Sequence, residues 1–200
     1  LHREAGAIAT LQPRALLTRS GYHGHGVLDE GHLDLAKLLV GSEGTLALIT
    51  EATVRTQPLP PARGVALLFF DRLESAAMAA LHVPPMGAVA CDLMDRRLLT
   101  IARETDPRFE LLIPATAEAM LLVEFDGEQI SDVRRPLDEL VARVQRQTHL
   151  AFDARTTTDQ EELDFYWQLP RRVVPMLYRL RGSERPLPFV EDIAVPPVAL

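Results

Sequence analysis

VALLFF, residues 65–70, is the stretch of sequence that decides the fold. A short run of consecutive apolar residues is typical of a buried β-strand. The residues that follow, 73–81, repeat their apolar positions at helical spacing. Apolar strand patterns return over residues 88–94, 120–125 and 150–155, so the stretch begins a series of strands.

Helices are predicted between these strands. Asp95 can cap a helix after the second strand, and Ser131 or Asp132 can open a longer helix after the third. A further helix is predicted from Thr158, and Pro170 should kink or break it. Strands that alternate with helices indicate an α/β or α+β sheet with its helices on one face.

A proline-rich segment, residues 57–61 (QPLPP), divides the chain, because X-Pro steps end regular structure. Before it, Leu35 and Leu38 give a short helical apolar face, and Gly41 is placed to end that helix. Residues 45–55 alternate between apolar and polar side chains, which predicts a strand. The chain therefore has a shorter first part and a longer second part.

The composition limits the possible partners. The chain has 200 residues and a net charge of −7, with 28 acidic and 21 basic side chains, so general attraction of nucleic acid is not expected. Its single cysteine cannot form an internal disulfide, which fits a reducing compartment. No apolar run reaches the roughly 20 residues of a membrane-spanning helix. Because the sequence starts at Leu1 and its end reads as a continuing chain, we expect both ends to be cut from a longer protein.

The turn between the first helix and the predicted strand of the first part, residues 41–45 (GSEGT), is the best candidate for chemistry. Two glycines three residues apart let backbone approach a ligand closely, and their N–H groups can hold a phosphate or a polar ring edge. The turn lacks the Lys-Ser/Thr of a P-loop and the third glycine of a dinucleotide fingerprint. On spacing alone, a plain turn explains it better.

The longer context is more specific. LLVGSEGTLALITEAT (residues 38–53) resembles the segment that closes the FAD-binding domain of the vanillyl-alcohol oxidase superfamily. It is most similar to the D-lactate and D-2-hydroxyglutarate dehydrogenases and the glycolate oxidase flavoprotein subunit. RSGY (19–22) resembles a Ser/Thr-Gly-Tyr element of that family, and DLMD (92–95) lies where relatives carry Glu-Leu-Met-Asp. PLPFVEDIAVP (186–196) resembles a segment of large bacterial members fused to an iron–sulfur module.

The resemblance implies an α+β layout in two parts. Residues 1–58 would be the last helix and strand of an FAD-binding domain. Residues 62–200 would be a substrate-binding cap domain, truncated at its end: a ferredoxin-like antiparallel sheet with helices on one face. The family transfers a hydride from a D-2-hydroxy acid to the flavin and passes the electrons on, here to a possible iron–sulfur module or subunit. The implied location is cytoplasmic, with peripheral attachment to the inner membrane as an alternative.

The resemblance also implies site residues. Six residues become candidates for flavin contact: Gly41, Ser42, Glu43, Gly44, Ile49 and Tyr22. Ile49 has a second interpretation, as a core residue of the strand. The family's glycine-rich pyrophosphate loop and its His-rich motifs would lie outside residues 1–200, so this chain alone is expected to bind FAD weakly or not at all, and no catalytic residue is assigned.

An arginine from the last helix holds the substrate carboxylate in relatives. A guanidinium–carboxylate pair is the natural way to hold a 2-hydroxy acid. Here Pro170 occupies the place where a gapless match puts that arginine, so Arg171 or Arg172 must serve. The alternative is an ordinary basic pair on a helix surface.

Other interpretations remain open. His23, His25 and His32 lie close together, but a His-x-His pair in a glycine loop is too few ligands, so no metal is predicted. A non-catalytic α/β interaction module is the first alternative function. A superfamily oxidase acting on a sugar, an alcohol or an ether lipid is the second.

Overall fold

The computed structural model describes residues 2–10, 21–22, 24, 26–29, 32–171 and 175. These residues form two compact units, one up to Gln57 and one from Pro58 onward. Several residues named above lie outside the described part: His23, His25, Arg172 and the segments 19–20 and 186–196.

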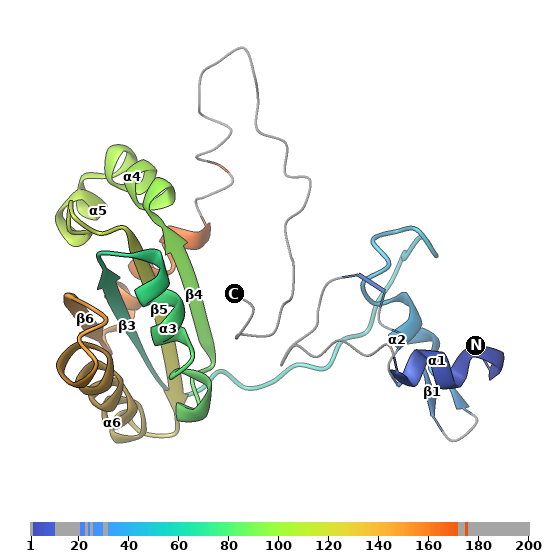
Figure 1. Cartoon of the computed structure of the whole chain (residues 1–200). Helices are drawn as coiled ribbons and strands as arrows, with labels where there is room; N and C mark the ends of the chain where they lie inside the picture. Colours follow the sequence, from blue (N-terminus) through green and yellow to red (C-terminus); the bar gives the residue numbers. More distant parts are fainter. Residues whose placement is uncertain are drawn as a thin grey trace, which may run out of the picture. The chain divides into compact units, whose positions relative to one another are not determined.

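The first unit consists of short elements (Figure 1). A 3₁₀ turn over His2–Glu4 precedes α1, Ala5–Thr10. Strands β1, Leu28–Asp29, and β2, His32–Leu33, pair in an antiparallel hairpin. The predicted helix is present as α2, Leu35–Leu39, where the Asp34 carboxylate accepts the Lys37 N–H at 3.0 Å as an N-cap.

The strand predicted over residues 45–55 is wrong. Residues 47–60 have no regular secondary structure. Leu48 is 90% exposed and Val54 75% exposed, so the alternating apolar side chains do not form a buried face. A strand needs a neighbour for its N–H and C=O groups, and none of the described residues pairs with this segment.

The second unit is built on one four-stranded antiparallel sheet. Its strands are β3, Ala62–Phe70; β4, Ala90–Asp95; β5, Ala119–Gly127; and β6, Asp153–Thr157. Their order is β4-β5-β3-β6, so β5 and β3 are central. Helix α3, Leu73–Ala80, follows the first strand and α6, Ile130–Val141, the third, which is the ferredoxin-like arrangement predicted (Figure 1). The α+β class is confirmed.

The prediction of helices on one face only is wrong. Ala66 and Leu68 on β3 pack on the side of α3 and α6, whereas Val65 and Leu67 pack on the opposite side. That opposite side is covered by α4, Arg96–Thr105; α5, Pro107–Leu112; and α7, Gln160–Tyr166. A continuous apolar strand places apolar side chains on both faces of the sheet, so helices must pack on both faces to bury them.

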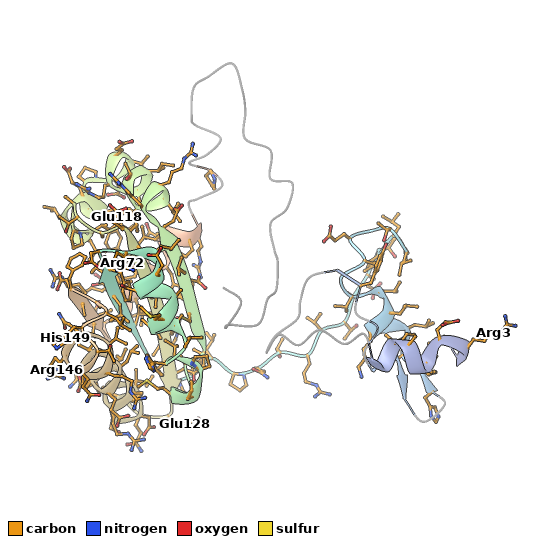
Figure 2. All side chains as sticks on the ribbon, in the orientation of Figure 1. Arg3, Arg72, Glu118, Glu128, Arg146 and His149 are labelled. Carbon is orange, nitrogen blue, oxygen red and sulfur yellow. The ribbon has the colours of Figure 1, made fainter. Side chains whose placement is uncertain are left out.

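The ends of the helices follow local capping chemistry. Asp95 caps α4 as predicted, accepting the Leu98 N–H at 3.0 Å. Helix α6 begins at Ile130, and the Asp132 carboxylate accepts the Gln129 N–H at 2.9 Å, as in a capping box. Charged side chains such as Glu128 and Arg146 project from the surface of this unit (Figure 2).

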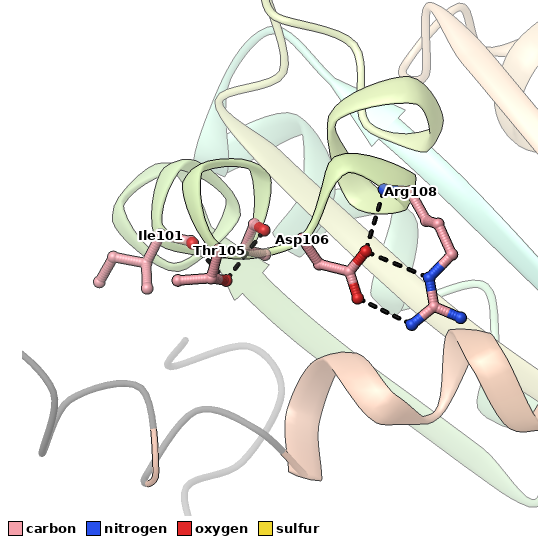
Figure 3. Close-up of polar contacts among 5 residues, drawn as sticks. Ile101, Thr105, Asp106 and Arg108 are labelled. Atoms are coloured by element: carbon pink, nitrogen blue, oxygen red, sulfur yellow. Dashed lines mark hydrogen bonds and ion pairs between the residues drawn. The ribbon is translucent and has the colours of Figure 1, made fainter.

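Helix α5 was not predicted. At its start, Asp106 accepts the N–H of Arg108 at 3.0 Å and forms two further bonds with the Arg108 guanidinium, while the Thr105 hydroxyl closes α4 on the carbonyl of Ile101 at 2.8 Å (Figure 3). Pro107 occupies the first helical position, where it fits well. A short 3₁₀ turn, Pro84–Met86, lies before β4.

The fourth strand begins three residues later than predicted. A π-helix, Ala142–Gln147, continues α6. Both Leu150 and Ala151 donate their N–H groups to the carbonyl of Val144, at 2.9 and 3.2 Å. These two apolar residues therefore close the helix end and do not extend the sheet.

Candidate functional site

The glycine turn of the first unit has an unusual backbone. Gly41, Glu43 and Gly44 have φ angles of 76°, 49° and 77°. This left-handed region is easily reached by glycine and is costly for most other residues. Ser42, between them, is 4% exposed. At its two glycines the turn has no side chain between its backbone and a ligand, which is the property expected of a ligand loop.

A second segment lies against this turn. A Cβ atom added to Gly41 would lie 2.1 Å from the carbonyl oxygen of Gly21, so only glycine fits there. The Thr45 hydroxyl donates to the Ser42 carbonyl, and the Tyr22 hydroxyl donates to the Thr45 oxygen at 2.6 Å. The segment of Tyr22 and the glycine turn are thus joined side by side, far apart though they are in sequence.

The six predicted flavin residues divide into two groups. Tyr22 and residues 41–44 come together as one surface, and Tyr22 itself is 64% exposed. Ile49 is not part of that group in any contact of the described residues and is 62% exposed. Its second interpretation, a core strand residue, is wrong, since the strand is not formed. Around Gly44 there is open space, because an added Cβ meets nothing within 4 Å.

The second unit contains a buried charge that the sequence did not reveal. Glu124 on β5 is 5% exposed. The guanidinium Nε of Arg63 donates to one carboxylate oxygen at 2.6 Å, and the Trp167 indole N–H donates to the other. The bond to Glu124 raises the pKa of Arg63 above its ordinary value. The only signal in the sequence was a single acidic residue within the apolar run 120–125.

Trp167 connects this buried charge to the predicted substrate arginines. It is the residue at which α7 ends, and residues 168–171 are helical again beyond it. The predicted break of the helix is confirmed and lies at Trp167. Pro170 is its physical cause, because a proline ring clashes with the carbonyl four residues earlier, here that of Tyr166, the last residue of α7. Arg171 is exposed.

Asp92 is a second titratable side chain on the sheet. It is half-buried on β4, and desolvation raises the pKa of its carboxyl above the ordinary value. Groups with a pKa shifted by burial are frequent at functional sites. Asp92 therefore belongs among the candidates, although the sequence marked it only as part of a family segment.

We expect the substitution Asp92→Asn to stabilise the fold at pH 7 by less than about 1 kcal/mol, because the side chain is only partly buried and water still screens its charge. The raised pKa means that the charged carboxylate costs folded-state stability at every pH above it. The gain should therefore disappear as the pH falls below the ordinary aspartate range. Thermal melts at pH 7 and pH 3 measure it, with the exposed Asp138→Asn as control; an equal gain at both pH values would contradict the expectation.

A cavity of about 240 Å³ lies between α6 and β6. It is lined by Arg134, Leu137, Asp138, Thr156, Thr157 and Thr158. None of the predicted site residues lines it. Within the described ranges, no three His, Cys, Asp or Glu side chains converge to hold a metal ion. In that same part of the chain, no helix is both long and apolar enough to cross a bilayer.

Comparison with known proteins gives one family and several relatives. Residues 59–200 match the family described as FAD linked oxidases, C-terminal domain. The chain is 32% identical over 174 residues to a D-2-hydroxyglutarate dehydrogenase of Pantoea ananatis, and the alignment covers 82% of this chain and 17% of that relative. It is 31% identical over 159 residues to the glycolate oxidase subunit GlcD of Escherichia coli, with 78% of this chain and 31% of that relative aligned. It is 28% identical over 165 residues to the mitochondrial D-lactate dehydrogenase [cytochrome] 1 of Saccharomyces cerevisiae, with 80% of this chain and 25% of that relative aligned.

Proposed function

Because the chain belongs to the family of FAD-linked oxidase C-terminal domains, we propose that it forms the substrate side of a flavoprotein that oxidises a D-2-hydroxy acid. The observation that carries this proposal is that the three relatives above are named for D-2-hydroxyglutarate, glycolate and D-lactate, all 2-hydroxy acids. The chain spans about 17 to 31% of the length of these relatives. The activity therefore belongs to a longer protein of which residues 59–200 contribute the family domain.

FAD is the cofactor that the family name gives. The residues proposed to hold it are Tyr22 and the turn 41–44, with Ile49 as a further contact. The turn fits such a ligand, because Gly41 and Gly44 keep side chains away from its backbone and the space at Gly44 is open. The flavin would accept the hydride from C2 of the acid. The domain division that follows is residues 1–58 on the flavin side and 62–200 on the substrate side.

Arg171, with Arg172, is proposed to hold the substrate carboxylate. Arg171 is exposed and lies four residues after Trp167, the residue at which α7 ends. A guanidinium presents two parallel N–H groups to a carboxylate, so it fixes orientation as well as charge. Oriented in this way, the C2–H of the acid can face the flavin, which a point charge would not achieve.

The substitution Arg171→Lys tests this proposal in the full-length protein. We expect the KM for the 2-hydroxy acid to rise about 10- to 30-fold, because lysine keeps the charge and loses the two-pronged hydrogen bond. Steady-state kinetics with D-lactate, glycolate and D-2-hydroxyglutarate give the measurement. Arg146→Lys, at an exposed position on the π-helix (Figure 2), is the matched control. Unchanged KM and kcat in both Arg171→Lys and Arg172→Lys would refute the role of this pair.

The same assay decides between the candidate functions. Turnover of sugars or alcohols without a carboxylate would favour the oxidase alternative. No turnover of any of these compounds, together with binding of another protein, would favour an interaction module. We propose that the electrons pass to an iron–sulfur module or subunit, and that the protein acts in the cytoplasm or at the inner face of the membrane.

A further inference from the structure

Glu124 occupies a central position that is costly for a charge. It lies on β5, between β4 and β3, opposite Ala90 on one side and Val65 on the other. At 5% exposure its carboxylate has lost nearly all contact with water. A buried carboxylate is tolerated only when hydrogen bonds replace that water. Its partners therefore show what the position is used for.

Each oxygen of this carboxylate has its own donor. Arg63, across the strand pair on β3, donates its Nε–H to Oε1 at 2.6 Å. Trp167 donates its indole N–H to Oε2. Arg63 alone would compensate the negative charge of Glu124. The hydrogen bond from Trp167 therefore adds a second contact, which connects the centre of the sheet to the end of α7. The separation of 43 residues makes it a tertiary contact.

Trp167 lies between α7 and the helical residues 168–171. Its backbone N–H still bonds to the Leu163 carbonyl, at 3.1 Å, and α7 ends there. Two residues on, Leu169 is 2% exposed and packs into the core beside the sheet. Trp167 and Leu169 thus fix the backbone just before Arg171 at two points, and Arg171 itself is exposed. Four helical residues span only about 6 Å, so a shift of the indole moves Arg171 directly.

We propose that Glu124 and Trp167 are a positioning pair that holds Arg171 in place for the substrate carboxylate. The inference rests on the proposed function, since it needs Arg171 to bind the acid. Neither residue touches the substrate. Their bond transmits the rigidity of the two central strands to the arginine, and arginine binding to a carboxylate depends strongly on geometry.

The experiment uses four variants of the full-length protein: Trp167→Phe, Glu124→Gln, Arg171→Lys and the double variant Trp167→Phe/Arg171→Lys. We expect Trp167→Phe to raise KM for the 2-hydroxy acid about tenfold and to leave kcat within about twofold, because binding and not chemistry is affected. In the double variant the Trp167→Phe change should add less than about twofold to the KM of Arg171→Lys, since coupled residues are not additive. Tyr166→Phe, the neighbouring aromatic residue, is the control and should leave KM unchanged.

Fluorescence of the 200-residue chain checks the contact itself. Trp167 is the only tryptophan, so its emission reports this site alone. We expect Glu124→Gln to shift or enhance that emission while the thermal melt remains cooperative.

The outcomes separate the two proposals. An unchanged KM in Arg171→Lys overturns the proposed carboxylate site and the positioning role with it. A raised KM in Arg171→Lys together with an unchanged KM in Trp167→Phe overturns the positioning role alone. The positioning role is also overturned if the KM increases of the two single variants multiply fully in the double variant. Identical Trp167 fluorescence in the wild type and Glu124→Gln overturns it as well.

Discussion

Gly41→Ala is expected to weaken flavin binding by the full-length protein about 100-fold, the equivalent of roughly 2.7 kcal/mol. Two costs combine at this residue. The φ angle of 76° is strained for alanine, and its Cβ would lie 2.1 Å from the Gly21 carbonyl oxygen. Because the obstacle is backbone, no side chain can rotate away, and the segment of Tyr22 must separate from the turn. The flavin content of the purified protein, read from its absorbance spectrum, measures the effect.

Gly44→Ala provides a matched control. Gly44 has nearly the same φ angle, 77°, but an added Cβ there meets nothing within 4 Å. It carries the strain of the left-handed conformation without the collision, so its effect should be about tenfold or less. Equal flavin loss in the two variants would show that the conformation alone matters and that the approach of residue 21 does not. Full flavin retention in Gly41→Ala would contradict the proposed flavin turn.

Arg63→Met is expected to lower the free energy of unfolding by about 3 kcal/mol, because it leaves Glu124 buried with one donor fewer and without a counter-charge. A loss of about 3 kcal/mol lies at the lower end of the range for removing one partner of a buried ion pair. The lower end applies because the Arg63 side chain is 28% exposed, whereas the Glu124 side chain is 6% exposed. Methionine keeps most of the arginine stem, so the loss of the charged head dominates. Urea unfolding of the chain, followed through Trp167 fluorescence, measures it.

The comparison is with Arg96→Met. Arg96 forms an ion pair with Glu118 at 3.2 Å, but both side chains are well exposed, at 70% and 42%. Exposed pairs contribute at most about 1 kcal/mol, so this variant should unfold nearly as the wild type does. If Arg63→Met costs no more than Arg96→Met, Glu124 is being stabilised by something other than Arg63.

The second unit was predictable because its signals are local. Apolar runs located the first three strands, the fourth began three residues later than predicted, and Asp95 marked the start of α4, since strand periodicity and helix capping act within a few residues. The incorrect prediction, that helices cover only one face of the sheet, concerned the same apolar run, residues 65–70. A run without polar residues already requires cover on both faces. On the second face α4, α5 and α7 supply it, and nothing local to their sequences says which face of the sheet they pack against.

The site was harder to predict because its contacts join distant residues. The longer sequence context of residues 41–44 predicted a flavin-contacting turn, although the glycine spacing alone favoured a plain turn, and nothing local indicated that Gly21 would approach Gly41. Likewise, nothing local indicated a buried charge at Glu124, because its hydrogen-bond donors, Arg63 and Trp167, lie 61 and 43 residues away in the sequence. The failed strand at residues 45–55 has the same origin: alternation describes one chain, whereas pairing requires a second.

The segment that leaves the glycine turn has a practical consequence for handling the chain. Between residues 46 and 59, Leu46, Leu48, Ile49, Val54 and Leu59 are all at least half exposed. An extended, unpaired backbone with alternating greasy side chains is a template for edge-to-edge association between copies. Among the residues that the structure describes, this is the stretch in which we expect aggregation in concentrated solution to start, while the packed sheet of the second unit remains folded.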